Sequence, residues 1–184
     1  VPKVKHTAQI LYIIYITLTV VQIIFLCIGK MPLFDSLATA FGTAGTGGFG
    51  IKNDSAASYS TYIQWVLTIF MILFGVNFNA YYYILYKQFK KAFKMEEVRY
   101  YFLIIIAAVG IICYHIIDTT KSFFEALTQA SFQVASIITT TGFSSIDFNK
   151  WSQTCKTVLV FLMFCGACAG STGGGIKVSR FIIL

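Results

Sequence analysis

Three stretches of the chain lack charged residues and are long enough to cross a membrane as helices. They cover residues 7–29, 59–86 and 100–117. A helix needs about 20 mostly apolar residues to span the hydrocarbon layer of a bilayer. Because these stretches carry no polar face that water could cover, the pattern predicts membrane-spanning helices rather than core helices of a soluble protein.

Two shorter segments, 32–44 and 121–138, are only moderately apolar and are rich in Ala, Thr, Ser and Gln. Pro32 suits the start of a helix, and Asp35 and Glu125 favour the positive end of a helix dipole. Each segment leads into a glycine turn: "GTGGFG" at 45–50, the first glycine turn, and "TTTGF" at 139–143, the second. We expect re-entrant helices that enter from outside and point their C-terminal ends into the membrane.

The chain repeats itself with an offset of 94 residues. Residues 46–49 then fall on 140–143, the run 7–29 falls on 101–123, and the run from 59 falls on that from 153. Membrane transport proteins often preserve such internal repeats in layout more than in identity. The sequence therefore predicts two units, 1–94 and 95–184, each built as helix, short helix, glycine turn and helix.

Irregular backbone inside a membrane is tolerated only where protein buries it or where it lines water. An extended stretch with glycine can aim consecutive carbonyl oxygens at an axis, where they replace the water around a cation. Threonine adds a hydroxyl at the inner end, and the following phenylalanine can wedge the strand against helices. The alternative is that both turns are mere connections, which leaves their matching positions after short helices unexplained.

Composition and charge agree with a membrane protein. Hydrophobic residues make up 57% and charged residues 11% of the chain, whereas soluble domains carry about 25% charged residues. If successive helices cross the membrane in alternating directions, nine basic residues and only two acidic ones, Glu96 and Glu97, lie on one side of the membrane. On the other side the positive and negative charges cancel. The nine basic residues are Lys3, Lys5, Lys87, Lys90, Lys91, Lys94, Arg99, Lys177 and Arg180. The basic side is expected to be cytoplasmic, with both glycine turns facing outside, so the net charge needs no nucleic-acid partner.

The last apolar run, 157–169, is expected to be a helix too short to span, because a glycine-rich segment follows it. Each glycine costs a helix interior about 1 kcal/mol relative to alanine. The glycine-rich segment consists of Gly170, Ser171, Thr172, Gly173, Gly174 and Gly175. The 94-residue offset places it opposite residues 75–81, where we expect a continuous helix whose Asn77 and Asn79 meet the segment or cavity water.

Other chemistries find little support. Cys165 and Cys168 form a C-x-x-C without a second pair, and His6 and His115 have no nucleophile nearby in sequence. Gly170 and Gly175 have phosphate-loop spacing, but Ile176 separates them from the lysine and an apolar helix precedes them. No enzyme, cofactor or nucleotide site is therefore expected.

The motifs "GTGGFG", "TTTGF" and "AGSTGGGIKVSR" (169–180), in this order, resemble the TrkH/KtrB family of bacterial potassium uptake proteins. The resemblance covers essentially the whole chain and implies an all-α membrane protein with tandem helix–pore loop–helix repeats of potassium-channel type. In that family four such repeats surround one pore. The two units resemble the second and third, so the chain is expected to be the central portion of a longer protein in the bacterial cytoplasmic membrane.

The resemblance also implies the roles of residues. The K⁺ selectivity filter would comprise Gly45, Thr46, Gly47, Gly48, Thr139, Thr140, Thr141 and Gly142. The family's one filter glycine per repeat maps to Gly48 and Gly142, and a serine at such a position goes with sodium transport in related transporters. Gly47 departs from the pattern that Thr141 keeps, which removes packing behind the filter. The glycine-rich segment would be an intramembrane gating loop; a kink that serves packing alone is the alternative.

The family implies a homodimer and a cytoplasmic ring of nucleotide-binding regulatory subunits, which the basic linker 87–99 could contact. The linker could also bind membrane lipid. The competing function is a structural membrane subunit that docks a cytoplasmic partner through this linker and conducts no ions.

Overall fold

The computed structural model describes residues 2–183, apart from the side chains of residues 2–6 and 93. The side chains of Lys3, Lys5 and His6, which entered the sequence argument, therefore lie outside the described residues. The described backbone is helical and contains no β-sheet, only one isolated bridge between Cys165 and Ile176. The helices are α1 (Pro2–Ile28), α2 (Leu33–Ala44), α3 (Thr61–Gly75), α4 (Phe78–Leu85), α5 (Phe89–Phe93), α6 (Glu96–Ile116), α7 (Phe123–Ile138), α8 (Gln153–Phe164) and α9 (Val178–Ile183), with 3₁₀ turns at Ile117–Thr119 and Phe148–Lys150.

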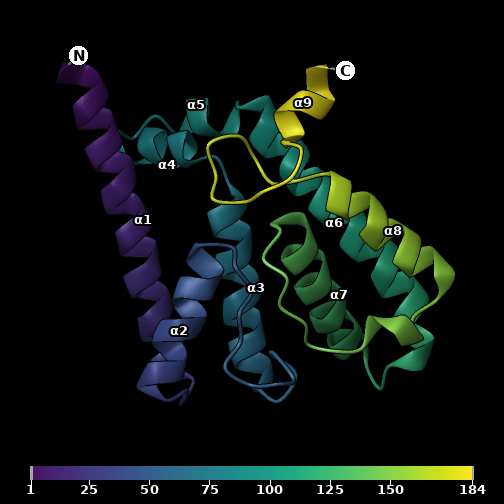
Figure 1. Ribbon diagram of the computed structural model, residues 1–184. Coiled ribbons are helices and arrows are strands. Elements are labelled where there is room, and N and C mark those ends of the chain that lie inside the picture. The colour runs from purple at the N-terminus through teal and green to yellow at the C-terminus, as the bar shows by residue number, and fades with distance from the viewer. Residues whose placement is uncertain (1, 184) are drawn as a thin grey trace.

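The helices form two groups that meet at α3 and α7 (Figure 1). Helices α1, α2 and α3 pack on one another, and so do α6, α7 and α8, while α3 and α7 join the groups. Trp65 Nε1 on α3 donates a hydrogen bond to Thr128 Oγ1 on α7 at 3.0 Å across this junction. The all-α class predicted from the sequence is therefore observed, and the division at residue 94 stays a prediction.

Within residues 2–183, two helices are long and apolar enough to cross a membrane, over Thr7–Ile28 and Glu96–Thr119. The third predicted span is not straight, because α3 and α4 meet at an angle of 90°. Val76 is extended, and the Asn77 side chain accepts a hydrogen bond from Asn79 N at 2.9 Å. Asn77 thus caps a new helix instead of continuing the old one. The expectation of a continuous helix over 75–81 was wrong.

The two short helices run toward the middle of the molecule (Figure 1). Pro32 precedes α2, and Ser122 Oγ caps α7 by accepting a hydrogen bond from Glu125 N at 3.2 Å. Both C-terminal ends point toward the yellow glycine-rich segment in Figure 1. Helices α2 and α7 therefore bring the two glycine turns to the same depth.

The apolar helix expected over 157–169 ends earlier, at Phe164. Gly166 N instead donates to Ile176 O at 2.7 Å, and a Cβ on Gly166 would lie 2.4 Å from Gly174 O. The chain therefore folds back on itself between α8 and α9, and Cys165 and Cys168 belong to this non-helical stretch.

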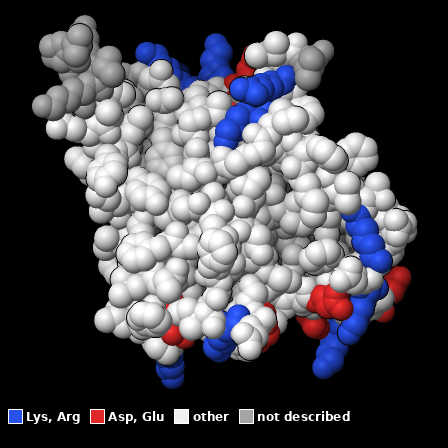
Figure 2. Space-filling view, viewed as in Figure 1, with Lys and Arg blue, Asp and Glu red and all other residues white. Residues whose placement is uncertain are grey.

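On the face shown in Figure 2, charged side chains gather mainly toward the two ends of the molecule. The end near α5 and α9 is mostly blue, the opposite end mixes both signs, and the middle is largely uncharged. An uncharged band between charged ends is the distribution that a bilayer requires.

Candidate functional site

The backbone of the first glycine turn is held by the helix that precedes it. Gly47 N and Gly48 N both donate to Gly42 O on α2, at 2.8 and 3.3 Å. Thr46 adopts a positive φ of 50° and Gly48 one of 65°. Two left-handed residues in so short a stretch turn the chain back out, and glycine adopts such angles at little cost.

The second glycine turn repeats this arrangement farther along the chain. Thr141 N and Gly142 N both donate to Ser136 O on α7, at 2.9 and 3.2 Å. Thr140 has a φ of 58° and Gly142 one of 90°. The internal repeat seen in the sequence is therefore also a repeat of backbone conformation and hydrogen bonding.

The two glycine turns lie directly against each other. A Cβ placed on Gly48 would stand 1.9 Å from Thr141 O, so the backbones approach as closely as glycine permits. Farther along, Ala56 N donates to Ser144 O at 2.8 Å, and Ser144 N donates to Ser55 Oγ at 3.1 Å. The stretches that follow the two turns therefore also lie side by side.

The phenylalanines that end the two turns behave differently. Phe143 is 3% exposed, and its ring would touch a Cβ placed on Gly42 of the other turn's helix, at 3.4 Å. Phe49 is 82% exposed. The predicted wedge of an aromatic against helices is thus correct for Phe143 and wrong for Phe49 within this chain.

Threonine hydroxyls connect the inner ends of both turns to the glycine-rich segment. Thr46 Oγ1 donates to Thr172 O at 3.1 Å, and Gly174 N donates to Thr140 Oγ1 at 2.7 Å. A Cβ on Gly173 would lie 3.1 Å from Thr139 O. The glycine-rich segment therefore sits immediately beneath the two turns, at the point where they converge.

The same segment is hydrogen-bonded to the bend between α3 and α4. Cys168 N, just before the segment, donates to Gly75 O at 3.0 Å, and Phe78 N donates to Gly170 O at 3.1 Å. The predicted proximity of residues 75–81 to the glycine-rich segment is observed. Asn77 is 7% exposed and bonded, whereas Asn79 is exposed.

Two charged residues to which the sequence argument gave no contact with the glycine-rich segment, Glu97 and Lys177, contact this region. Glu97 Oε2 accepts from Asn77 Nδ2 at 3.1 Å, and Glu97 Oε1 accepts from Ala169 N. Lys177 Nζ donates to the carbonyl oxygens of Gly173 and Gly174. In the sequence, each lies beside an apolar segment, and Lys177 also belongs to the motif at 169–180.

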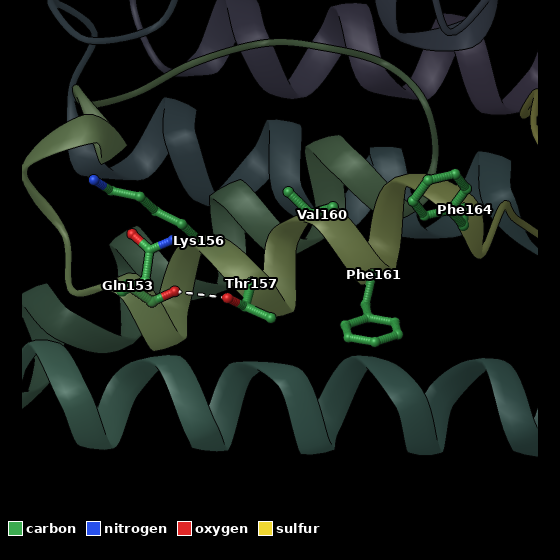
Figure 3. Close-up of a pocket in the computed structure, with 6 residues that line it drawn as sticks. All are labelled: Gln153, Lys156, Thr157, Val160, Phe161 and Phe164. Carbon is green, nitrogen blue, oxygen red and sulfur yellow. Dashed lines mark hydrogen bonds between the residues drawn. The ribbon is translucent and has the colours of Figure 1, made fainter.

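One cavity, of about 510 Å³, is lined by Gly170, Ser171 and Thr172 together with residues of α1 and Phe78. Two others lie near the turns and along α8. One, of about 460 Å³, is lined by the loops after both turns and includes Asp54 and Asp147. Burial raises the pKa of nearby Tyr59, in the loop before α3, and the carboxylates of Asp35 and Asp54 add to the rise. The other, of about 210 Å³, is lined by side chains of α8 alone, among them Lys156 (Figure 3). It shares no residue with the turns or the glycine-rich segment.

No group of three His, Cys, Asp or Glu side chains able to hold a metal occurs in the part of the chain that the structure describes. The cysteines of that part form no disulfide. The turns and the glycine-rich segment instead offer main-chain carbonyls and threonine hydroxyls. These are hard, uncharged oxygen ligands, which suit a weakly held cation.

Comparison with known proteins gives a consistent picture. The TrkH family model, described as a cation transport protein, matches residues 1–184. The Trk system potassium uptake protein TrkH of Salmonella typhimurium is 32% identical over 187 residues, which cover 100% of this chain and 39% of that protein. TrkG of Escherichia coli is 29% identical over 190 residues, covering 100% of this chain and 38% of its own length.

The crystal structure of the potassium transporter TrkH from Vibrio parahaemolyticus superposes with a TM-score of 0.93 at 30% identity, over 100% of this chain and 40% of that one. The chain spans about two fifths of the length of the curated relatives it matches. By sequence along its whole length and by fold, the chain belongs to the TrkH family of cation transport proteins.

Proposed function

We propose that the full-length protein carries K⁺ across the bacterial cytoplasmic membrane and that residues 1–94 and 95–184 supply two repeats of its pore. The family consists of cation transport proteins, not enzymes, and the matched relatives are named potassium uptake proteins. The single observation that carries the proposal is the contact between two glycine turns with the same backbone, where Gly48 lies against Thr141 O.

In the proposed filter, main-chain oxygens of residues 45–48 and 139–142 replace the water around K⁺. The hydroxyls of Thr46 and Thr140 lie at its inner end, where they bond the glycine-rich segment. Glycine rather than serine at positions 48 and 142 favours K⁺ over Na⁺. The remaining repeats of the full-length chain would complete the ring of oxygens.

The glycine-rich segment, residues 170–175, is proposed to be the gate. Its hydrogen bonds to Thr46 and Thr140 support this role, because a segment bonded beneath both turns obstructs any ion that leaves them inward. Glycine lets the segment change conformation at little steric cost. Ion passage requires that these two bonds break.

The proposed setting follows from the charges. The glycine turns face outside, and the linker 87–99 faces the cytoplasm, where Lys87, Lys90, Lys91 and Lys94 are exposed. This linker is the proposed contact for a cytoplasmic nucleotide-binding regulatory subunit and for anionic lipid. The assembly is proposed to be a homodimer.

Rubidium uptake by the full-length protein, in a strain deficient in potassium uptake, tests the function. Gly142→Ser tests the filter, because no atom lies within 4 Å of a Cβ at Gly142 and the serine meets only the strain of the left-handed φ of 90°. We expect weaker discrimination against Na⁺. Gly110→Ser controls for the added hydroxymethyl group alone, since Gly110 on α6 also has open space around it but no left-handed φ. Unaltered Na⁺ discrimination in Gly142→Ser would count against the filter assignment.

Deletion of residues 173–175 tests the gate. Removing a barrier raises ion flux in the full-length protein reconstituted without its regulator. Unchanged or lower flux, in a protein that expresses and elutes normally, contradicts the gate.

The second candidate function, a subunit that docks a cytoplasmic partner and conducts nothing, is favoured by the exposed lysines of the linker. The same uptake measurement decides between the two. A partner that binds the full-length protein while rubidium uptake is absent would favour docking alone.

A further inference from the structure

We infer that Glu97 is a positioning residue that holds the glycine-rich segment against the α3–α4 bend and so keeps the proposed gate closed. The inference rests on the proposed gating function and deepens it. It names a carboxylate outside both the filter and the gating segment as the group that sets the resting position of the segment.

The bend between α3 and α4 leaves backbone groups that the glycine-rich stretch satisfies. A continuous helix would have used Phe74 O and Gly75 O for its own next turn. Instead, Thr172 N donates to Phe74 O at 3.3 Å, and Cys168 N donates to Gly75 O at 3.0 Å. The bend and the segment are therefore hydrogen-bonded to each other and not merely adjacent.

Glu97 bonds both partners of this contact with its two carboxylate oxygens. One oxygen accepts from Asn77 Nδ2 at 3.1 Å, across 20 residues of chain, and the other accepts from Ala169 N, across 72 residues. Ala169 immediately precedes the glycine-rich segment. Hydrogen bonds to a carboxylate are about twice as strong as neutral ones, so Glu97 adds a charge-assisted connection between the bend and the start of the segment.

Both polar atoms of the Asn77 side chain make hydrogen bonds in this arrangement. Its Oδ1 accepts from Asn79 N at 2.9 Å to cap α4, which leaves Nδ2 to donate to Glu97. Asn77 cannot turn over its amide without losing the cap. The orientation of the pair is therefore fixed from one side by the start of α4.

The position of Glu97 connects the segment to the cytoplasmic end of the molecule. Glu97 lies in the first turn of α6, near the end of the basic linker 87–99. Helix α4 leads from the bend to the start of the same linker (Figure 1). A regulator that moves the linker would therefore act on Glu97 and on the bend that holds Asn77 at once.

The pair can be exchanged without losing a hydrogen bond. In Glu97→Gln, one acceptor oxygen becomes an amide nitrogen, so either Asn77 or Ala169 N loses its acceptor; in Asn77→Asp, two carboxylates face each other. In the double variant Asn77→Asp/Glu97→Gln, the new amide at position 97 donates to the new carboxylate at position 77, and its oxygen still accepts from Ala169 N. The new carboxylate also still caps α4. Rescue by exchange separates a specific pair from a general need for a folded bend.

The experiment measures basal rubidium flux of the full-length protein in proteoliposomes without regulator. We expect each single variant to raise flux by about tenfold, because losing one charged hydrogen bond shifts a two-state equilibrium by about that factor. The double variant returns flux to within about twofold of the parent, because the exchanged pair restores the bond. Glu96→Gln, at the adjacent exposed carboxylate, leaves flux unchanged.

Single variants with unchanged or lower flux overturn the inference, as does a double variant that conducts like the singles. Deletion of residues 173–175 serves as the reference. If the deletion raises flux and Glu97→Gln does not, the result supports the proposed gate and contradicts the role of Glu97. If neither variant raises flux, the result contradicts both the proposed gate and the role of Glu97.

Discussion

The two glycine turns have nearly the same backbone but different surroundings. In each, a left-handed threonine and a left-handed glycine follow a short helix, and one carbonyl of that helix accepts from two successive amides. Yet Gly48 has no room for a side chain, whereas Gly142 has no atom within 4 Å of a Cβ. The local sequence therefore sets the conformation of each turn, and its neighbours set which substitutions it tolerates.

The two turns also differ in the threonine hydroxyls that pack behind the second turn. Thr139 Oγ1 and Thr141 Oγ1 lie 2.8 Å apart and are buried, and Ser136 Oγ donates to Phe143 O at 2.6 Å. The first turn has Gly47 in place of Thr141 and lacks the hydroxyl pair. The second turn is therefore braced by side chains, and the first is braced by contact with the second.

The largest difference is expected from alanine at the two left-handed glycines. Gly48→Ala adds a methyl group that overlaps Thr141 O, in a conformation that alanine disfavours, and costs about 5 kcal/mol. Gly142→Ala bears only the conformational cost of about 1–2 kcal/mol. Thermal unfolding of the full-length protein in detergent, together with rubidium uptake, measures both. Equal losses for the two variants would show that the contact is unimportant.

The second-largest difference between the two turns is expected when the phenylalanine that ends each turn is replaced by alanine. Phe143→Ala empties a buried position and costs about 3 kcal/mol, at the lower end for such changes because the unfolded reference in a membrane is also apolar. Phe49→Ala is expected to be nearly neutral in this part of the protein, since Phe49 is exposed. The unfolding midpoints of the two variants measure the difference. A larger loss for Phe49→Ala in the full-length protein would mean that another repeat covers it.

The inner threonines differ in what their loss leaves unpaired. Thr140→Val removes the acceptor of Gly174 N, an exposed amide that water can reach, so it costs about 1 kcal/mol and raises basal flux about fivefold if the segment is a barrier. Thr46→Val removes a donor that Thr172 O shares with Gly45 O, so a smaller rise of about threefold is expected. Basal rubidium flux in proteoliposomes checks the order. A greater effect at Thr46 would contradict it.

The smallest effects on stability are expected at Gly47 and Thr141, the equivalent positions at which the two turns differ in sequence. Thr141→Val deletes the hydroxyl that meets Thr139 and costs about 1 kcal/mol. Gly47→Ala places a methyl group 3.1 Å from the ring of exposed Phe49, which can move away, so stability changes by less than about 0.5 kcal/mol. Unfolding midpoints compare them. A destabilised Gly47→Ala would indicate that Phe49 is held in place.

Much of the site was predictable because its elements are local. The short helices begin after Pro32 and Ser122, and the predicted glycine turns contain left-handed glycines at Gly48 and Gly142. Such features depend on neighbours along the chain. The left-handed conformation of Thr46 and Thr140 was not predicted, because a β-branched residue rarely adopts it. The bend at Val76 was missed because a capping asparagine inside an apolar run does not differ, by hydrophobicity alone, from a tolerated polar residue.

The sequence by itself determined the membrane class, the internal repeat and the two glycine turns, because charge-free length, glycine and helix caps act over a few residues. Only the tertiary structure decided that Gly48 lies on Thr141 and that Glu97 joins Asn77 to Ala169. These contacts join residues far apart in the chain. Their geometry depends on how α3, α6 and α7 pack, which no local pattern of residues specifies.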